Sequence, residues 1–419
     1  MQDTHDTTPQ VMDVALENTV DATVPYDRWL LLLTLILMGF GVVMVYSASI
    51  VNAAMAGNLT VDHNDQSFFL TRQMIYCGLA LFIMVVMINV PIRFLRRFAI
   101  PFFAISLIAL GLVLFKPLAI EAKGATRWIG YGPLRFQPSE GIKFAWIIFL
   151  AAYFADRQDR LHRWRDSWLV PTLCLLAIVG LLAIQKDFGT TVICSGLLIL
   201  MVFAAGARIR HLVTAGIAGL GALSVLVIME PYRMRRLFSF LDPDADPLGD
   251  SYQIRQALIS FGSGDWTGLG LGGSRQKLAY LPEAHTDFVF SILGEELGLI
   301  GVSVVVVLFA LFVWRGFRVA RRAYSSFGAL LAFGITAEIG FQAMANMAVA
   351  TALLPTKGLT LPFMSYGGSS MLVLGFAVGV LLNISKHPRL DTALDAPPSN
   401  PTMENEAAPR EWALAGEQP

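Results

Sequence analysis

The chain is poor in charged residues. Of its 419 residues only 15% are charged, against roughly 25% in an average soluble domain, while 55% are hydrophobic. So few polar side chains cannot cover the surface of a water-soluble fold of this size, and a chain this apolar is not expected to stay disordered. The composition therefore predicts a polytopic membrane protein.

Other absences narrow the function. The three cysteines, Cys77, Cys174 and Cys194, lie inside apolar runs and suit no disulfide or metal spacing. Walker, Gly-x-Ser-x-Gly and His-Glu-x-x-His motifs are missing, which argues against an ATPase, a serine hydrolase and a zinc protease. The run 268–273 matches Gly-x-Gly-x-x-Gly but follows no strand of a βαβ unit, so we expect a flexible loop. No cleaved signal peptide is evident at the N-terminus.

Long apolar runs, by contrast, are frequent. A helix needs about 20 apolar residues to cross the hydrocarbon core, and ten such runs can be identified. They are 29–50, 72–90, 97–116, 138–156, 168–184, 189–206, 211–229, 287–313, 324–350 and 363–385. We therefore expect an all-α membrane domain over 29–387, with ten transmembrane helices and a large extracytoplasmic loop, 230–286, between the seventh and eighth. The polar ends, 1–28 and 388–419, are predicted to be disordered cytoplasmic tails.

Arginine indicates the orientation. It collects in alternate short loops, at Arg93, Arg96, Arg97, Arg157, Arg160, Arg163, Arg165, Arg208, Arg210, Arg315, Arg318, Arg321 and Arg322. The positive-inside rule makes that face cytoplasmic, together with both termini. The richer loops, 51–71, 117–137, 230–286 and 351–362, then face outward, which in a bacterium is the periplasmic side of the inner membrane. Chemistry on that side has no access to cytosolic ATP.

Polar residues at the span entries are the candidate functional groups, because charges in or beside a membrane helix are costly. Glu140 and Lys143 are three apart on one helix face at the start of the fourth span. Asp187 precedes the sixth span, and Asp287 precedes the eighth. Structural alternatives remain for each: an internal ion pair for Glu140 and Lys143, and helix N-caps for the aspartates. The run 365–370, Ser-Tyr-Gly-Gly-Ser-Ser, suits either a site or close helix packing.

The even-numbered spans begin at the outer face in this topology. Their N-terminal N–H groups and positive dipole ends therefore point to one side and favour an anion, for which a lipid diphosphate is the obvious membrane candidate. Lys357, Lys143 and arginines of the 230–286 loop can add charge-assisted hydrogen bonds.

The motifs resemble those of the SEDS family (shape, elongation, division and sporulation). The resemblance lies in Asn346 followed by the run 353–370, in Pro-Glu-Ala-His-Thr-Asp-Phe at 282–288, in Lys-Gly-Ala-x-Arg-Trp at 123–128, and in Gln-Pro-Ser-Glu-x-x-Lys at 137–143. It covers roughly residues 25–390, and the motifs look like the division branch rather than the elongation branch. One departure is Lys186, where family members often have proline.

The resemblance implies a ten-helix peptidoglycan glycosyltransferase that polymerises lipid II at the division septum. It implies a class B penicillin-binding protein as partner, with an interface on the eighth and ninth spans, other divisome membrane proteins, and no nucleic acid. Asp287 is the expected catalytic base. Expected substrate-binding residues are Lys357, His285, Thr286, Ser365, Arg127 and Lys123; expected cavity residues are Glu140, Lys143, Asp187, Glu295 and Glu296. No cofactor is certain; a divalent cation, Mg or Mn, could accompany the diphosphate.

Three alternatives stay open. A lipid II flippase would suit ten helices with buried ions, but it predicts charges along a path through the bilayer, whereas here they gather at one face. An elongation-type polymerase would share the chemistry. A scaffold that recruits a synthase would leave Asp287 unexplained.

Overall fold

The structure is a computed structural model. It describes residues 26–55, 68–115, 119–122, 125–131, 134–161, 163–229, 231–242, 249, 251–278, 280–356 and 358–388. The expectations of disorder for 1–25 and 389–419 lie outside the described residues. Tyr26 to Arg28 and Pro388, which we assigned to the tails, belong to the folded body: Arg28 begins a helix, and Pro388 forms an isolated β-bridge with Ala323.

Apolar runs form most of the elements. In chain order the helices are α2 (Arg28–Met55), α3 (Phe68–Asn89), α4 (Ile92–Arg97), α5 (Ala99–Leu112), α6 (Pro138–Ala155), α7 (Val170–Ile184), α8 (Phe188–Ala204), α9 (Ile209–Ile228), α10 (Pro231–Leu241), α11 (Tyr252–Gly264), α12 (Val289–Arg322), α13 (Ser326–Ala350) and α14 (Gly368–Ser385). A 3₁₀ turn, η1 (Gln158–Arg160), and a π-helical turn, η2 (Arg165–Leu169), precede α7.

Each of the ten predicted spans corresponds to a helix. In the described part of the chain, six helices are long and apolar enough to cross a membrane by length and composition: α2, α3, α7 with its preceding turn, α12, α13 and α14. Two shorter apolar helices are α5 and α8. The chain is therefore a polytopic helical membrane protein.

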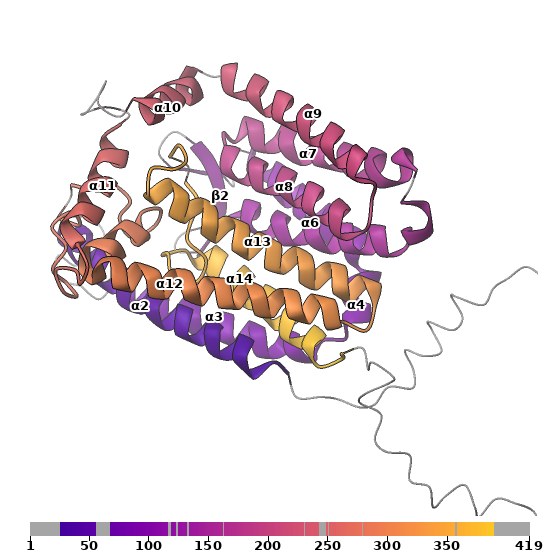
Figure 1. The fold of residues 1–419 in the computed structure, drawn as a ribbon, viewed down its shortest axis with the longest axis horizontal. Helices are drawn as coiled ribbons and strands as arrows, with labels where there is room; N and C mark the ends of the chain where they lie inside the picture. The colour runs from indigo at the N-terminus through magenta and orange to yellow at the C-terminus, as the bar shows by residue number, and fades with distance from the viewer. Residues whose placement is uncertain are drawn as a thin grey trace, which may run out of the picture.

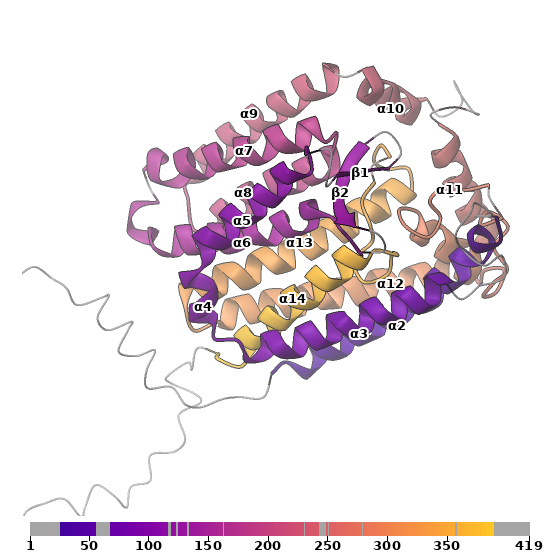
Figure 2. The same ribbon diagram turned by 180° about the vertical axis from the view of Figure 1, so that it is seen from behind.

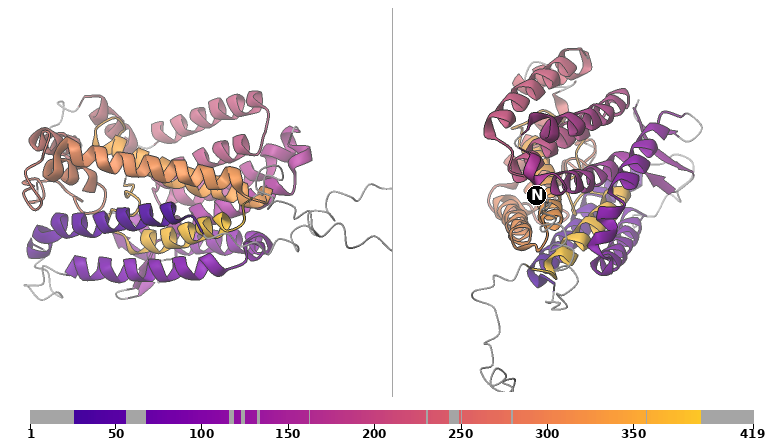
Figure 3. Two further views of the ribbon diagram at one scale, coloured as in Figure 1. Left: turned by 60° about the horizontal axis from the view of Figure 1, so that its bottom comes forward. Right: turned by 90° about the vertical axis from the view of Figure 1, so that its right-hand side faces the viewer.

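The centre of the bundle is formed by α6, α13 and α14. In α13 and α14, 72% of the most apolar stretch is buried, against 22% in α3 and α12, which places the latter two at the periphery. Helix α14 packs closely against α3, where a Cβ at Gly375 would lie 2.4 Å from the carbonyl oxygen of Ala80. A Cβ at Gly379, four residues on, would lie 2.6 Å from the carbonyl oxygen of Met84, so a Gly-x-x-x-Gly face lets these helices meet. Figures 1 and 3 show α9 at the opposite edge of the molecule from α2.

One end of the bundle collects the arginine-rich turns. Arg96 in α4 pairs with Asp156 at 2.7 Å, and Arg315 in α12 pairs with Asp27 at 2.6 Å. The backbone N–H of Asp27 donates to Ser385 Oγ at 3.0 Å, so both ends of the described chain lie at this same end. Figure 1 shows α4 there, far from α11.

The all-α expectation was incomplete, because a small antiparallel sheet occupies the 117–137 loop. Its strands are β1 (Ala119–Ala122), β2 (Ala125–Tyr131) and β3 (Leu134–Phe136), in the order β1-β2-β3. Trp128 pairs with Ile120, and Gly130 with Arg135. Threonine, tryptophan, isoleucine and tyrosine in β2 favour a strand, but our reading for apolar runs of membrane length passed over it. Figure 2 shows the sheet in the same half of the molecule as α10 and α11, opposite α4.

Candidate functional site

Asp287 lies in a tight turn just before α12. Its backbone N–H donates to the carbonyl of Glu283 at 3.1 Å, and Glu283 has a positive φ of 58°. The N-cap of α12 is Phe288, not Asp287, and it forms no side-chain cap bond. The alternative in which Asp287 is the N-cap therefore does not fit this helix.

The carboxylate of Asp287 faces the 351–367 loop. Its Oδ2 lies 3.4 Å from the position of a Cβ built on Gly358, and Nη1 of Arg127 lies 4.0 Å from the same point. A carboxylate from the α12 entry and a guanidinium from β2 thus converge on one exposed glycine. The absence of a side chain at position 358 keeps the space beside them open.

Arg127 also holds the sheet against the turn between α7 and α8. Its Nη2 donates to the carbonyl of Lys186 at 2.7 Å. Lys186 has a φ of +57°, a backbone conformation that proline cannot adopt because its ring fixes φ near −65°. The next residue, Asp187, is buried and is the N-cap of α8, accepting from Thr190 N at 3.1 Å and from Thr190 Oγ1 at 2.9 Å.

His285 and Thr286 are fixed by neighbouring loops. The His285 ring lies 5.1 Å from the Phe69 ring and 5.9 Å from the Tyr366 ring, and its carbonyl accepts from Tyr366 N at 3.0 Å. Burial raises the pKa of Tyr366 above its ordinary value, so this phenol is neutral at physiological pH. Thr286 Oγ1 donates to a Glu283 carboxylate oxygen at 3.0 Å.

Ser365 is engaged within the loop itself. It is buried, and its Oγ accepts from the backbone N–H of Leu361 at 2.8 Å. Those contacts suit a residue that shapes the loop. Lys357 and Lys123, both expected to bind substrate, lie outside the described residues. A neighbouring cation that we named only as part of the 230–286 loop is Arg236 in α10, which donates to the carbonyl of Thr356 at 3.0 Å.

Glu140 and Lys143 form a buried ion pair at 3.1 Å, as their spacing predicts. Two further residues of α13, which our sequence reading missed, complete the cluster: Lys143 Nζ lies 3.0 Å from Glu338 Oε1 and donates to Gln342 Oε1. Lys143 is 1% exposed, and these partners surround its ammonium group.

The α13 residues connect this ion cluster to Asp287. The side-chain amide of Gln342 donates from Nε2 to the Thr360 carbonyl at 2.9 Å. Asn346 Nδ2 donates to both the Leu359 carbonyl, at 2.6 Å, and the Asp287 carbonyl, at 2.9 Å. The signal that would have found these residues is their i, i+4, i+8 spacing, with Glu338 first, on one face of an otherwise apolar helix.

Glu295 and Glu296 belong to a second buried cluster. Glu296 accepts from Ser47 Oγ at 2.6 Å and pairs with Lys277 at 2.8 Å, which ties α12 to α2. Glu295 accepts from Ser274 Oγ and from Arg275 N. Both carboxylates are therefore fully used in holding the loop that precedes Asp287.

The glycine-rich run 268–273 is part of that cluster. We expected a flexible loop, but the N–H groups of Leu269 and Gly270 each donate at 3.0 Å to the carbonyls of Glu295 and Glu296. These bonds are possible because α12 breaks at Gly298, with φ 63° and ψ −165°. The first helical segment of α12, which follows Asp287, is thus held separately from the rest of the helix.

Comparisons with known proteins fit this arrangement. A family model described as a cell cycle protein, FtsW/RodA/SpoVE, matches residues 28–390. A Geobacter sulfurreducens protein named probable peptidoglycan glycosyltransferase FtsW is 45% identical over 86% of this chain and 95% of its own length. Stage V sporulation protein E of Bacillus subtilis is 42% identical over 87% of this chain and 98% of its own.

Solved structures are similar as well. A chain of a peptidoglycan synthase complex, described for its coordination of polymerization and crosslinking, matches with a TM-score of 0.68 and 31% identity over 86% of this chain and 97% of its own. Thermus thermophilus RodA matches with a TM-score of 0.62 and 30% identity over 88% and 98% of the two chains. The matched range takes in every motif quoted above, and the chain belongs to the FtsW/RodA/SpoVE family of cell cycle proteins, the SEDS family.

Proposed function

We propose that this chain is a peptidoglycan glycosyltransferase that polymerises lipid II into glycan strands, with Asp287 as general base. The names of the relatives support the activity. The main structural support for this site is that Asp287 Oδ2 and Arg127 Nη1 both lie within 4.0 Å of the position that a Cβ on Gly358 would occupy. A base beside a cation is what this displacement requires.

In the reaction, the acceptor GlcNAc 4-hydroxyl attacks the anomeric carbon of the donor MurNAc. The Asp287 carboxylate takes the hydroxyl proton as the new glycosidic bond forms. The bond to the polyprenyl diphosphate breaks, and its electron pair leaves with the diphosphate. A single displacement of this kind inverts the anomeric centre, and the leaving group supplies the free energy without a nucleotide.

Cations around the 351–367 loop stabilise charge on the departing diphosphate. Arg127 is fixed by its bond to the Lys186 carbonyl, so its guanidinium is preorganised beside Gly358. We assign Lys357, Lys123 and Arg236 to the same role. His285 and Thr286 line the sugar side of the base, while Ser365 shapes the loop.

Within the described residues, no group of three or more His, Cys, Asp or Glu side chains meets that could hold a metal ion by itself. We assign charge stabilisation to the arginines and lysines and derive no step through a cation.

The proposal includes the architecture in which this site operates. All ten apolar helices span the bacterial inner membrane, both tails are cytoplasmic, and the site faces the periplasm. Residues 26–388 form the membrane domain, with 230–286 as its large periplasmic loop. A class B penicillin-binding protein crosslinks the strands that this chain produces at the division septum, alongside other divisome membrane proteins.

The direct test is to incubate the purified chain with lipid II, with and without its transpeptidase partner, and to separate glycan products by gel electrophoresis. We expect strands of many disaccharides and release of polyprenyl diphosphate. Lipid II that stays unpolymerised in the presence of an active partner would refute the proposal.

A lipid II flippase is the second candidate, and one observation favours it. Glu338 is buried near the middle of α13, so the charges reach deeper than the one face that we expected. The two functions separate in proteoliposomes with fluorescent lipid II. A flippase moves the lipid between leaflets in an Asp287→Asn variant, whereas the polymerase that we propose does not move it in either form.

A further inference from the structure

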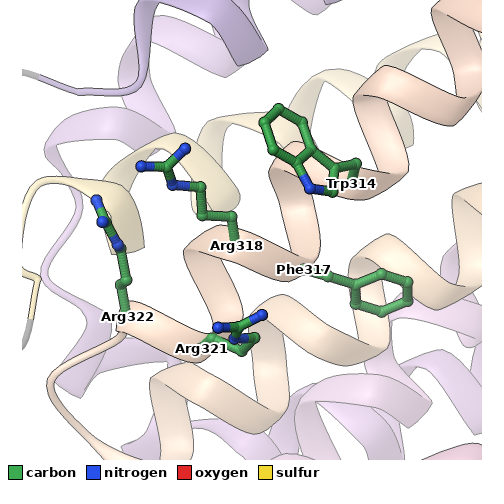
Figure 4. A pocket seen from close by; sticks show the side chains of 5 residues that line it. All are labelled: Trp314, Phe317, Arg318, Arg321 and Arg322. Atoms are coloured by element: carbon green, nitrogen blue, oxygen red, sulfur yellow. The ribbon is translucent and has the colours of Figure 1, made fainter.

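The arginine-rich end of α12 carries a cavity that the proposed reaction does not use. It has a volume of about 460 Å³ and is lined by Trp314, Phe317, Arg318, Arg321 and Arg322. Figure 4 shows the two rings and three guanidinium groups projecting from the last turns of this one helix. In the proposed orientation this end lies at the cytoplasmic face, across the membrane from Asp287.

The three arginines form a positive cluster on α12. Within the described residues, no aspartate or glutamate lies within ion-pair distance of Arg318, Arg321 or Arg322, whereas the neighbouring Arg315 is paired with Asp27. Arg318 lies 5.9 Å from the Trp314 ring, so one of the three is in cation–π range. Three guanidinium groups in one cavity favour a phosphate, which they can bind through several charge-assisted hydrogen bonds.

The surface below the cavity is apolar. Val307, Leu311 and Trp314 follow one another at helical spacing and are about half exposed. Tryptophan with its ring in the hydrocarbon and its N–H near the headgroups is typical of the membrane interface. A phosphate seated among the arginines would therefore have hydrocarbon chains directly beneath it.

We propose that this cavity binds the headgroup of an anionic phospholipid of the cytoplasmic leaflet. A transmembrane partner helix is a poor occupant, because the positive-inside rule gives its cytoplasmic end lysine and arginine rather than acids. Basic pockets beside membrane helices on this side are suited to anionic headgroups. The assignment to the cytoplasmic leaflet depends on the proposed orientation of the chain, whereas the affinity of the arginines for a phosphate does not.

The test compares the full-length protein in dioleoylphosphatidylcholine nanodiscs with increasing fractions of dioleoylphosphatidylglycerol. The site variant is Arg318→Gln/Arg321→Gln/Arg322→Gln. The matched control, Arg160→Gln/Arg163→Gln/Arg165→Gln, removes three exposed arginines from another turn at the same face. Native mass spectrometry counts the retained lipids, and thermal unfolding measures their effect on Tm.

We expect phosphatidylglycerol to raise the Tm of the wild type and the control equally. The site variant should bind it at least tenfold more weakly, because it loses the charge-assisted hydrogen bonds that three guanidinium groups make together to one headgroup. Equal loss in site and control variants would show unspecific attraction and overturn the proposal. So would an equal effect of inorganic phosphate, which would make this a free-anion site.

Two other occupants give distinct results. The wild type and the site variant are also compared in phosphatidylcholine alone. If their Tm values still differ there, and the difference disappears in a chain that ends at Pro388, the acidic tail occupies the cavity. Loss of the transpeptidase partner without loss of lipid response would make the cavity a protein contact. Either result overturns the lipid site. Glycan synthesis by the site variant in phosphatidylcholine reports separately on the proposed function.

Discussion

Asn346 shows how one buried amide can position a reactive group through its backbone. Its Nδ2 donates to the carbonyls of Asp287 and Leu359, so it joins the turn that carries the proposed base to the loop that faces it. Asn383, near the other end of the bundle, makes the same kind of double contact with the carbonyls of Met87 and Val90. The two asparagines provide a matched comparison.

Asn346→Ala should lower the rate of lipid II polymerisation by about 10- to 100-fold, the cost of a displacement of about 1 Å at a reacting group. Asn383→Ala leaves two carbonyls unpaired in the same way, so it should lose similar thermal stability while keeping polymerisation. The measurements are Tm and initial rate for both variants. Equal rates in the two would show that Asn346 does not position Asp287.

Lys143 is the central residue of the buried ion cluster. Within the described residues, it is the only cation paired with Glu140 and Glu338. Lys143→Met should destabilise the fold by about 3–5 kcal/mol, the usual effect of removing one side of a buried pair. Glu140→Gln should cost less, since Glu338 keeps its partner. Thermal unfolding in one detergent gives the order; a more severe loss in Glu140→Gln would contradict the cluster as described.

At the scale of elements, the break in α12 separates a short helical segment beside Asp287 from the rest of the helix. Gly298 has a conformation that only glycine adopts readily, and a Cβ there would lie 2.5 Å from the backbone nitrogen of Gly268. The glutamates before it bind the glycine-rich loop. We infer that the break and the loop form one unit that sets the angle of the Asp287 turn.

Gly298→Ala should therefore reduce stability by about 3 kcal/mol through strain and overpacking. Polymerisation should fall further than stability alone explains, because the Asp287 turn loses its support. Gly180→Ala in α7 is the control, since no atom lies within 4 Å of its added Cβ. An active, stable Gly298→Ala variant would show that the break is not needed.

Elements that consist of long apolar runs were predictable, and those that depend on tertiary contacts were not. The ten helices follow from apolar runs of sufficient length. Strand β2 did not stand out, because seven residues with an arginine inside a polar loop carry little hydrophobic signal. The glycine-rich loop packs against the carbonyls of Glu295 and Glu296, which the break in α12 leaves without helical partners. No local sequence pattern predicts that contact.

For the whole molecule, the proposed orientation has a direct consequence. A cysteine placed between Met55 and Phe68 should react with a membrane-impermeant maleimide in spheroplasts, whereas a cysteine at Gln158 should react only after lysis. Both substitutions are made in a chain whose three native cysteines are replaced by alanine. The opposite labelling pattern would invert the topology and place Asp287 in the cytoplasm.

The candidate site was predictable to the extent that its chemistry lies in local motifs. Asp287 and Glu140 stand in short polar runs at span entries, and Arg127 stands in a motif that resembles one of the SEDS family, so they were found. Glu338 and Gln342 lie in the middle of a long apolar helix, and their partners are more than 190 residues away in the chain. Only the folded bundle shows that they stabilise Lys143.

The most direct measurement is glycan synthesis by purified Asp287→Asn with its partner. Asparagine is nearly isosteric with aspartate but cannot take a proton, so the fold and the partner complex should persist. We predict a loss of polymerisation of about 100-fold or more, the scale of general-base removal, with an unchanged Tm. Near-normal glycan strands from the folded variant would contradict the account.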